Sequence, residues 1–343
     1  MDQRPAVVLL NLGGPDSLLA VRPFLYNLFS DPDIFRLPLA WLTQRPFAWL
    51  VSRRRAPEAA KGYAAIGGKS PLLANTEAQA RALQEALAVG AADARVAAAG
   101  GNHPAAKAGA PLADVYVCMR YWHPMAPEVV AELKRRGYRR VVLLPLYPQY
   151  SVTTTGSACN AFLRACRRQQ YQPAIDIIRE WYDEPMYQQA IVAALRRELA
   201  ALPDPRPERV ELLLSAHGLP RRLADAGDPY RGQIEATAAA VRARLGWPNV
   251  TLCYQSRVGP LEWLRPYTED VIRAKGRAGA KQMLVYPIAF VSDHVETLYE
   301  LGIVYAALAQ ESGIAHYRVV PALNDDPQLI EALRARVRRV LGV

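Results

Sequence analysis

Carboxylates and an imidazole gather in residues 283–301, the stretch where the sequence most strongly indicates chemistry. Its first half is a continuous apolar run, typical of a strand buried on both faces, and its second half has helical spacing. At roughly 100° per residue, Asp293, Glu296 and Glu300 fall on one stripe that begins where the strand ends. Asp293 and Glu296 also stand in capping-box register, and His294 lies beside them. Because parallel α/β sheets bind ligands at the carboxyl ends of their strands, we expect a site here.

A second strand ends at a histidine. Residues 210–214 are apolar apart from Glu211, and His217 follows, with Gly218 allowing the backbone to turn directly after it. A lone histidine is more often packed or solvated than catalytic. If both strands belong to one parallel sheet, His217 and Glu296 open onto the same edge. A neutral imidazole accepts protons at neutral pH, and carboxylates pass protons or bind a hard divalent ion.

The composition indicates a globular protein. Charged residues make up 22% and apolar residues 51% of the 343 residues, a length that suits two α/β units with full cores. No segment reaches the roughly 18 uninterrupted apolar residues of a membrane span, and the start lacks the hydrophobic region of a signal peptide. These features predict a cytoplasmic protein.

The cysteines and the net charge limit which metal sites and binding partners are expected. Cys118, Cys159, Cys166 and Cys253 have neither the spacing of a structural zinc site nor that of a disulfide framework, so we expect buried thiols. The formal charge of +10 suits nucleic acid, an anionic membrane surface or an acidic small substrate. Since the positive residues are spread along the chain without a nucleic-acid-binding motif, we expect no nucleic acid partner and favour the other two.

Two successive series of strands and helices are expected to position these groups. The first has predicted strands at residues 6–12, 115–119 and 140–146, helices at 75–89 and 128–136, and a surface insertion at 90–111. The second has predicted strands at 174–178, 210–214, 250–255 and 282–289, helices at 186–202, 229–245 and 266–275, and a last helix at 326–341 packing across the join. The pattern predicts an α/β fold of two Rossmann-like, doubly wound domains with parallel sheets, residues 1–165 and 166–343, and a cleft between them.

Residues 34–51 form an apolar, aromatic segment that we call the lip segment. It is interrupted by Pro38 and Pro46 and followed by Arg53-Arg54-Arg55. A buried pair of core helices is one interpretation. Aromatic residues beside a basic cluster also suit a lip resting on a membrane surface, or the mouth of a pocket for a flat hydrophobic ligand. The residues alone leave these interpretations open.

Seven motifs stand in order along nearly the whole chain. They are Leu-Asn-Leu-Gly-Gly-Pro from Leu10, Arg54-Arg55 with Pro57, Tyr63 with Ile-Gly-Gly-Lys-Ser-Pro, Arg120-Tyr121 with Tyr-Pro-Gln-Tyr-Ser, Ser-Ala-His-Gly-Leu-Pro, Gln-Ser-Arg-Val-Gly-Pro, and Ser-Asp-His-Val-Glu-Thr-Leu-Tyr-Glu-Leu. Together they resemble the ferrochelatases, which insert ferrous iron into protoporphyrin IX. The resemblance implies the terminal step of haem biosynthesis, with Fe²⁺ and protoporphyrin IX as substrates, haem and two protons as products, and a porphyrin cleft between the domains.

The resemblance also implies roles for individual residues. His217 matches the family's catalytic, metal-contacting histidine, and Glu296 the catalytic and metal-contacting carboxylate that faces it across the macrocycle. Asp293, His294 and Glu300 would extend an acidic path from Glu296. The implied porphyrin-binding residues are Leu12, Arg55, Tyr63, Ser70, Arg120, Tyr121 and Tyr150. The lip segment, Ile34 to Val51, matches the part of the family that contacts the membrane. We therefore expect peripheral contact with the inner face of the membrane.

Two departures from the family pattern affect the expected ligands. Glu58 stands where some relatives carry a lysine, which removes one implied contact to a porphyrin propionate. Some ferrochelatases hold a [2Fe–2S] cluster on cysteines near the C-terminus, but this chain has no cysteine after Cys253, so we expect no such cluster. No tightly bound cofactor is expected, because Fe²⁺ is a substrate.

The resulting hypothesis is that His217 accepts the pyrrole protons while Glu296 handles iron or protons on the opposite side of a bent ring. Which group carries the iron stays open. One histidine and one or two carboxylates make an incomplete metal site, which releases an ion that a closed cage would retain. The alternatives are a carrier that binds metal or tetrapyrrole without turnover, a transferase that binds phosphate at Gly13-Gly14-Pro15-Asp16, and a chelatase for cobalt or another tetrapyrrole.

Overall fold

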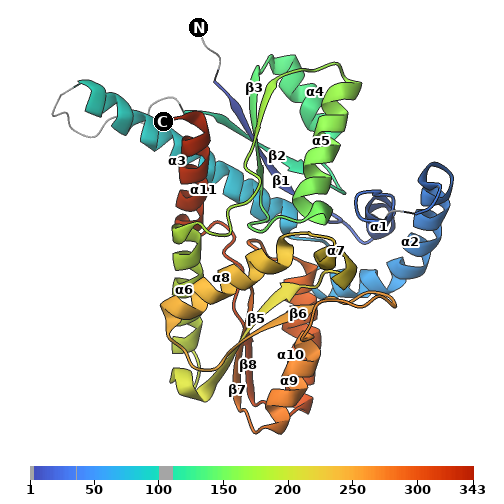
Figure 1. Cartoon of the computed structure of the whole chain (residues 1–343), viewed down its shortest axis with the longest axis vertical. Coiled ribbons are helices and arrows are strands. Elements are labelled where there is room, and N and C mark those ends of the chain that lie inside the picture. Colours follow the sequence, from blue (N-terminus) through green and yellow to red (C-terminus); the bar gives the residue numbers. More distant parts are fainter. Residues whose placement is uncertain (1–3, 36, 100–110) are drawn as a thin grey trace.

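Two four-stranded parallel sheets form the framework of the protein. The computed structural model describes residues 4–35, 37–99 and 111–343. The strand orders are β2-β1-β3-β4 in the first sheet and β6-β5-β7-β8 in the second, so both sheets have the same doubly wound topology. In Figure 1 the sheets follow one another along the long axis of the molecule, with helices around both. The predicted α/β fold of two doubly wound parallel sheets is confirmed.

The strands and helices have the following bounds. The strands are β1 (Ala6–Asn11), β2 (Asp114–Met119), β3 (Arg140–Pro145), β4 (Ala174–Ile177), β5 (Val210–His217), β6 (Val250–Gln255), β7 (Gln282–Pro287) and β8 (His316–Val319). The helices are α1 (Val21–Phe29), α2 (Ala40–Ala65), α3 (Leu72–Ala99), α4 (Ala126–Arg136), α5 (Ser157–Arg168), α6 (Pro185–Ala200), α7 (Arg221–Asp225), α8 (Tyr230–Leu245), α9 (Thr268–Arg277), α10 (Tyr305–Glu311) and α11 (Pro327–Leu341). Two π-helices, η1 (Val152–Gly156) and η3 (Glu296–Val304), and a 3₁₀ turn, η2 (Pro207–Arg209), complete the described elements.

The central strands β1 and β7 are largely apolar and buried along their whole length, because helices cover both faces of each sheet. All six residues of β1 and all six of β7 are buried. β1 pairs with β2 and β3, and β7 pairs with β5 and β8. Such continuous apolar runs are typical of parallel strands, and they explain why these two elements were predicted correctly.

The division between the two units differs from the prediction. The strand predicted at residues 174–178 was assigned to the second series, but β4 pairs with β3 in the first sheet. The second sheet instead takes β8, which was not predicted, as its edge strand beside β7. Both strands are only four residues long and partly exposed, so they lack the apolar run that identifies a buried strand. The sheets therefore separate after Ile177 rather than after residue 165, and we call the two parts the first and second halves.

Two helices extend further than predicted. α2 continues through Pro46, where the sequence indicated a break, because it packs against α1 over that length. α3 runs to Ala99, so the first part of the insertion predicted at residues 90–111 is helical. Residues 100–110 of that insertion lie outside the described residues.

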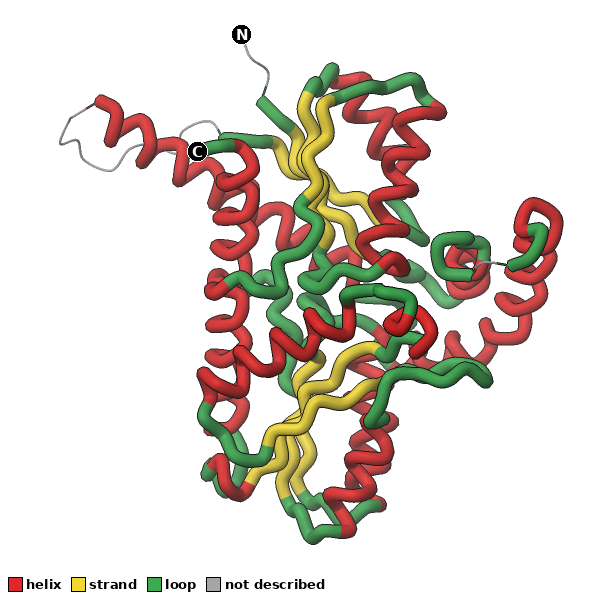
Figure 2. Tube along the Cα trace, viewed as in Figure 1, coloured by secondary structure: helices red, strands yellow, loops and turns green. Residues whose placement is uncertain are grey.

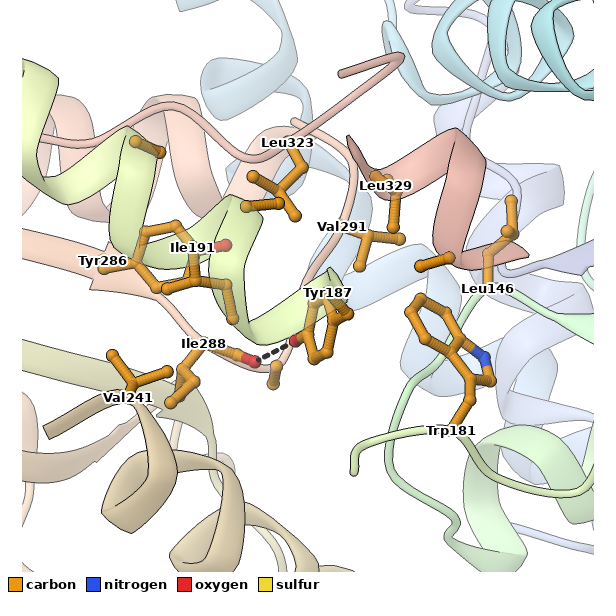
Figure 3. Close-up of a cluster of buried hydrophobic side chains, with 14 of the residues drawn as sticks. Leu146, Trp181, Tyr187, Ile191, Val241, Tyr286, Ile288, Val291, Leu323 and Leu329 are labelled. Carbon is orange, nitrogen blue, oxygen red and sulfur yellow. Dashed lines mark hydrogen bonds between the residues drawn. The ribbon is translucent and has the colours of Figure 1, made fainter. Parts of the chain in front are cut away.

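One hydrophobic cluster joins the halves. It contains Val7 and Leu9 of the first sheet together with Leu212 and Leu284 of the second. Figure 3 shows its centre, where Trp181 lies beside Tyr187 and the Tyr187 hydroxyl donates to the Ile288 carbonyl (3.2 Å). A continuous buried core of this kind holds the two sheets in one fixed arrangement.

Loops at the carboxyl ends of the two sheets meet between the halves. Figure 2 shows these loops between the strands of the two sheets. The Asn75 amide of α3 donates to the Asp293 carbonyl (3.1 Å), and the buried Gln79 amide donates to the Asn324 carbonyl (2.7 Å). α11 packs against both α3 and α6. The loops that follow β1, β3, β5 and β7 are thereby brought to one region of the molecule.

Candidate functional site

His217 is the last residue of β5, and its ring is oriented by its own turn. Nδ1 lies 2.6 Å from the Gly218 carbonyl, which can only accept, so Nδ1 carries the proton in that hydrogen bond. In the neutral ring Nε2 therefore keeps its lone pair. Trp263 and Phe290 flank the imidazole, with ring centroids 6.2 Å and 6.3 Å away. The arrangement presents a proton acceptor at the carboxyl edge of the second sheet.

Glu296 stands beside that acceptor. It opens the π-helix η3, and its Oε2 lies 3.7 Å from His217 Nε2 and 3.9 Å from His294 Nε2. Burial raises the pKa of Glu296, and the charge of Glu300 adds to the effect, while His217 opposes it. A carboxyl group whose pKa is raised by burial holds a proton more readily than an exposed one, and here it lies next to an imidazole that can exchange protons with it.

His294 is buried, and burial lowers its pKa to about 3, with the charge of His217 as a smaller cause. Its ring packs on Phe290 at a centroid distance of 4.4 Å. Within the described part of the chain, its Nδ1 has no hydrogen-bond partner. His294 is therefore neutral at physiological pH and limits the room around Glu296.

His217 and Glu296 lie closer together than the expected arrangement would place them. The two were expected to face each other across the macrocycle, but their nearest side-chain atoms are 3.7 Å apart. A flat ring between them needs roughly 7 Å, since each nonbonded contact takes about 3.5 Å. In this structure no flat ring fits between the two side chains.

The predicted acidic path is only partly supported. Glu300 accepts hydrogen bonds from the Ser256 backbone N–H (3.0 Å), the Ser256 hydroxyl and the Tyr305 hydroxyl (3.1 Å). Ser256 follows β6 in the left-handed conformation (φ +63°), and its hydroxyl also lies 3.4 Å from Glu296. Sequence reasoning did not select Ser256, although the strand-end criterion that selected His217 applies to it as well.

Asp293 has a structural role instead of a place on that path. Its carboxylate accepts from the Thr297 hydroxyl (2.9 Å), the Ala322 N–H (3.2 Å) and the Asn324 amide (2.8 Å). The predicted capping box with Glu296 is therefore wrong, because the loop after β8 supplies the donors that Asp293 accepts from. The helical stripe is also changed, since η3 is a π-helix rather than an α-helix.

Arg120 and Tyr121, at the end of β2, converge on a buried aspartate that the sequence did not reveal. Asp31 is 2% exposed and accepts from Arg120 Nη2 (2.8 Å), the Tyr121 hydroxyl (2.6 Å) and the Ser157 hydroxyl. Arg120 Nε also donates to Ser157 (2.7 Å). Tyr121 is fully buried, so it offers a ligand no surface here and fits a supporting role better than the predicted porphyrin contact.

Leu12, Tyr63 and Ser70 lie close to the first half's turn after β1. Leu12 and Tyr63 belong to the apolar cluster beneath α1 and α2. Burial, and then the charge of Glu296, raise the pKa of Tyr63, so α2 brings this side chain toward η3 of the other half. Ser70 donates its backbone N–H to the Pro15 carbonyl (2.8 Å) and packs on Gly14.

Arg55 and Tyr150 belong to different parts of the first half. Arg55 is exposed on α2, and Glu58 one turn later pairs with Lys61 (2.8 Å). Tyr150 follows β3 and is half-buried, with the Arg179 guanidinium over its ring (4.0 Å). The structure thus spreads the predicted porphyrin residues over α2, the connection from α2 to α3 and the strand-end loops of the first half, while His217 and Glu296 come from the second.

The lip segment is amphipathic rather than wholly buried. Ala48 packs beneath α1, whereas Trp41 is 82% exposed. The other exposed large apolar residues on this edge are Leu18, Leu19, Leu39, Leu42, Trp49 and Leu50. Among the described residues, no helix is both long and apolar enough to cross a membrane. A buried pair of core helices therefore does not account for this segment.

Metal-binding groups are sparse. The described residues contain no cluster of three or more histidine, cysteine, aspartate or glutamate side chains arranged to hold a metal ion. The four cysteines are buried and unpaired, and burial raises the pKa of the Cys253 thiol to about 12. The pair of His217 and Glu296 offers one nitrogen and one carboxylate ligand.

Comparisons with known proteins agree with the motif pattern. A family model described as Ferrochelatase matches residues 4–341. A protein named ferrochelatase from a Cyanothece species is 46% identical over 342 residues, covering 98% of this chain and 83% of that protein. Another from a Synechococcus species is 48% identical over 339 residues, covering 98% and 93%. Among solved structures, the sirohydrochlorin chelatase SirB from Bacillus subtilis subspecies spizizenii, in complex with cobalt, aligns over 98% of this chain and 95% of its own with a TM-score of 0.49 and 11% identity.

Proposed function

This chain belongs to the ferrochelatase family, and on that premise we propose that His217 and Glu296 act together on one face of the porphyrin. Membership makes porphyrin and iron the substrates and haem the product. We take the porphyrin to be protoporphyrin IX, because the apolar lip segment suits the less carboxylated ring. The observation that carries the proposal is the contact of 3.7 Å between His217 Nε2 and Glu296 Oε2.

Insertion of Fe²⁺ releases the two pyrrole N–H protons of the ring. Since Nδ1 of His217 donates to Gly218, Nε2 is the atom that accepts a pyrrole proton. Glu296 lies within reach to take that proton on, and burial raises the pKa of its carboxyl group, which favours the protonated form. The exchange frees Nε2 for the second proton. In this scheme the pair transfers protons from the ring toward solvent on one side.

The same pair also offers iron two ligands. Two protein ligands are fewer than the closed set of a structural site, so iron that contacts them is not retained. This suits an ion that must move on into the ring. This scheme requires no [2Fe–2S] cluster.

The test is an anaerobic absorbance assay with protoporphyrin IX and Fe²⁺. We expect wild-type protein to convert free porphyrin over many turnovers, and His217→Ala to lose roughly 10²–10⁴-fold in kcat. His123→Ala is the matched control, because this exposed histidine pairs with the surface residue Glu128 and packs edge-on against its neighbour Trp122. Full activity of His217→Ala would refute the assignment. Binding of porphyrin without turnover by every variant would indicate a carrier.

We further propose that the lip segment rests on a membrane surface. Trp41, Leu42, Trp49 and Leu50 are exposed on α2, and the guanidinium of Arg53 lies over the Trp49 ring (5.5 Å). Exposed aromatic residues beside arginines favour the interface of an anionic bilayer. Co-sedimentation with vesicles containing phosphatidylserine should therefore fall for Trp41→Ser/Leu42→Ser. An equivalent change at exposed Ile177, on β4, should leave it unaltered.

A further inference from the structure

Three consecutive residues before and at the start of α8 bond both halves of the protein at once. Asp228 is 9% exposed, and its Oδ2 accepts from the Ser151 hydroxyl (2.9 Å) and the Val152 N–H (2.9 Å), in the loop after β3 of the first half. Its Oδ1 accepts from the Tyr230 N–H (3.0 Å). The buried Tyr230 hydroxyl donates to the His217 carbonyl (2.9 Å). One short segment therefore links the first half to the backbone of His217.

The same loop is bonded to the next turns of α8. Gln233 Oε1 accepts from the Tyr150 N–H (2.7 Å), and the Gln149 amide donates to the Thr237 hydroxyl (3.2 Å). Gln149 and Thr237 are buried as well. α8 is thus attached to the loop after β3 at Asp228, Gln233 and Thr237 in succession, which makes it a rigid spacer between that loop and the end of β5.

The ring position of His217 depends on the backbone to which Tyr230 bonds. Nδ1 is held by the carbonyl of the very next residue, Gly218, so ring and turn move together. The turn leaves little space, since a Cβ on Gly218 would lie 2.9 Å from both the Gln255 carbonyl and the Trp263 ring. A shift of the His217 carbonyl would consequently displace Nε2 from Glu296.

From these contacts we propose that Asp228 and Tyr230 are positioning residues that hold His217 at a set distance from the first half. They touch neither substrate in the scheme. Asp228 fixes the start of α8 against Ser151 and Val152, and Tyr230 transmits that position to the His217 carbonyl. The inference rests on the proposed role of His217. Since a misplacement of about 1 Å in a catalytic group costs on the order of 10²-fold in rate, loss of either bond should act on turnover rather than on substrate binding.

The test compares two tyrosine hydroxyls of the same kind. Tyr230→Phe removes the donor to the His217 carbonyl, and Tyr187→Phe removes an equally buried donor to the Ile288 carbonyl, one residue beyond β7. We expect both variants to unfold at similarly lowered temperatures. Only Tyr230→Phe should lose about 10–100-fold in kcat, with KM for porphyrin and for Fe²⁺ within about twofold of wild type.

Two Asp228 variants test the contacts of its carboxylate. Asp228→Glu keeps the carboxylate but moves it by one methylene, and Asp228→Asn keeps the size but loses acceptor capacity. Both should lower kcat as Tyr230→Phe does. Because the two residues act as one unit, Asp228→Asn/Tyr230→Phe should be no worse than the poorer single variant.

Three outcomes decide the matter, with His217→Ala assayed alongside. A folded Tyr230→Phe protein with wild-type kcat overturns the positioning role, and so does an equal loss of kcat in Tyr187→Phe. In either case the proposed function stands if His217→Ala is inactive. Wild-type kcat in Asp228→Glu overturns it for Asp228. Full activity of His217→Ala instead means that the proposed function itself has failed.

Discussion

Acid should destabilise this protein partly through one histidine, and the size of the effect follows from its burial. His294 is 6% exposed, and burial lowers its pKa from 6.5 to about 3. Below pH 6.5 the unfolded chain binds a proton at His294, whereas the buried imidazole of the folded chain stays neutral until the pH approaches 3. Stability that is fully present above pH 6.5 is therefore lost as the pH falls toward 3.

The lowered pKa of His294 sets how much unfolding free energy is lost in acid. Each pH unit in that window costs about 1.4 kcal/mol per proton, so the loss at His294 between pH 7 and pH 5 is about 2 kcal/mol. His294→Gln keeps a polar group near the position of Nε2 but has no titration. Its unfolding free energy should fall by about 2 kcal/mol less than that of the wild type over the same interval.

Urea unfolding followed by tryptophan fluorescence at pH 7 and pH 5 measures the difference. His316→Gln, at an exposed position on β8, is the control and should follow the wild type. Titrating groups that do not contact His294 or His316 are common to all three proteins and cancel in the comparison. If wild type and His294→Gln lost the same stability within about 0.5 kcal/mol, the reasoning that burial keeps His294 neutral would be refuted.

Three further changes test the core, the site and the contact between the halves. Trp181→Ala removes a fully buried side chain from the shared core and should cost about 3–5 kcal/mol of unfolding free energy, measured by denaturant titration. Glu296→Gln should abolish iron insertion yet raise the melting temperature at pH 8, because burial raises the pKa of Glu296 and the variant has no charge to bury. Thermal scans at pH 5 should show a smaller gain in melting temperature, since part of the wild-type carboxyl group is then already protonated. An equal gain at pH 8 and pH 5 would contradict this cause. Gly62→Ala should lower both activity and melting temperature, since its Cβ would lie 3.0 Å from the Tyr299 ring on η3, whereas Gly232→Ala in α8 meets nothing within 4 Å and should stabilise the helix by about 0.5–1 kcal/mol. Equal effects of the two glycine replacements would argue against the contact.

Local signals in the chain were strongest where burial is complete. The apolar runs of β1 and β7 identified both as central parallel strands, whereas β5 was expected over residues 210–214 and continues to His217. The edge strand β4 was assigned to the wrong sheet, and the edge strand β8 was not predicted. An edge strand of four residues buries too few side chains to leave an apolar pattern in the sequence. Their places depend on pairing with β3 and β7, which is a tertiary property.

Within the site, residue types were easier to foresee than their partners. Asp293 was expected to cap a helix with Glu296, but donors from Ala322 and Asn324 occupy it. Asp31 gave no signal in sequence because its role lies in gathering Arg120, Tyr121 and Ser157, which are distant in the chain. Only folding brings such groups within hydrogen-bond distance.

The amino-acid sequence by itself determined the fold class and the family motifs, and it predicted His217 and Glu296 as site residues, because strand-end chemistry and apolar periodicity are local properties. The tertiary structure decided that these two side chains stand 3.7 Å apart on one side of the site. It also decided that Tyr230 and Asp228 tie His217 to the other half. Distances between residues far apart in sequence are set by the packing of α8 and η3 against the two sheets, and no local pattern encodes them.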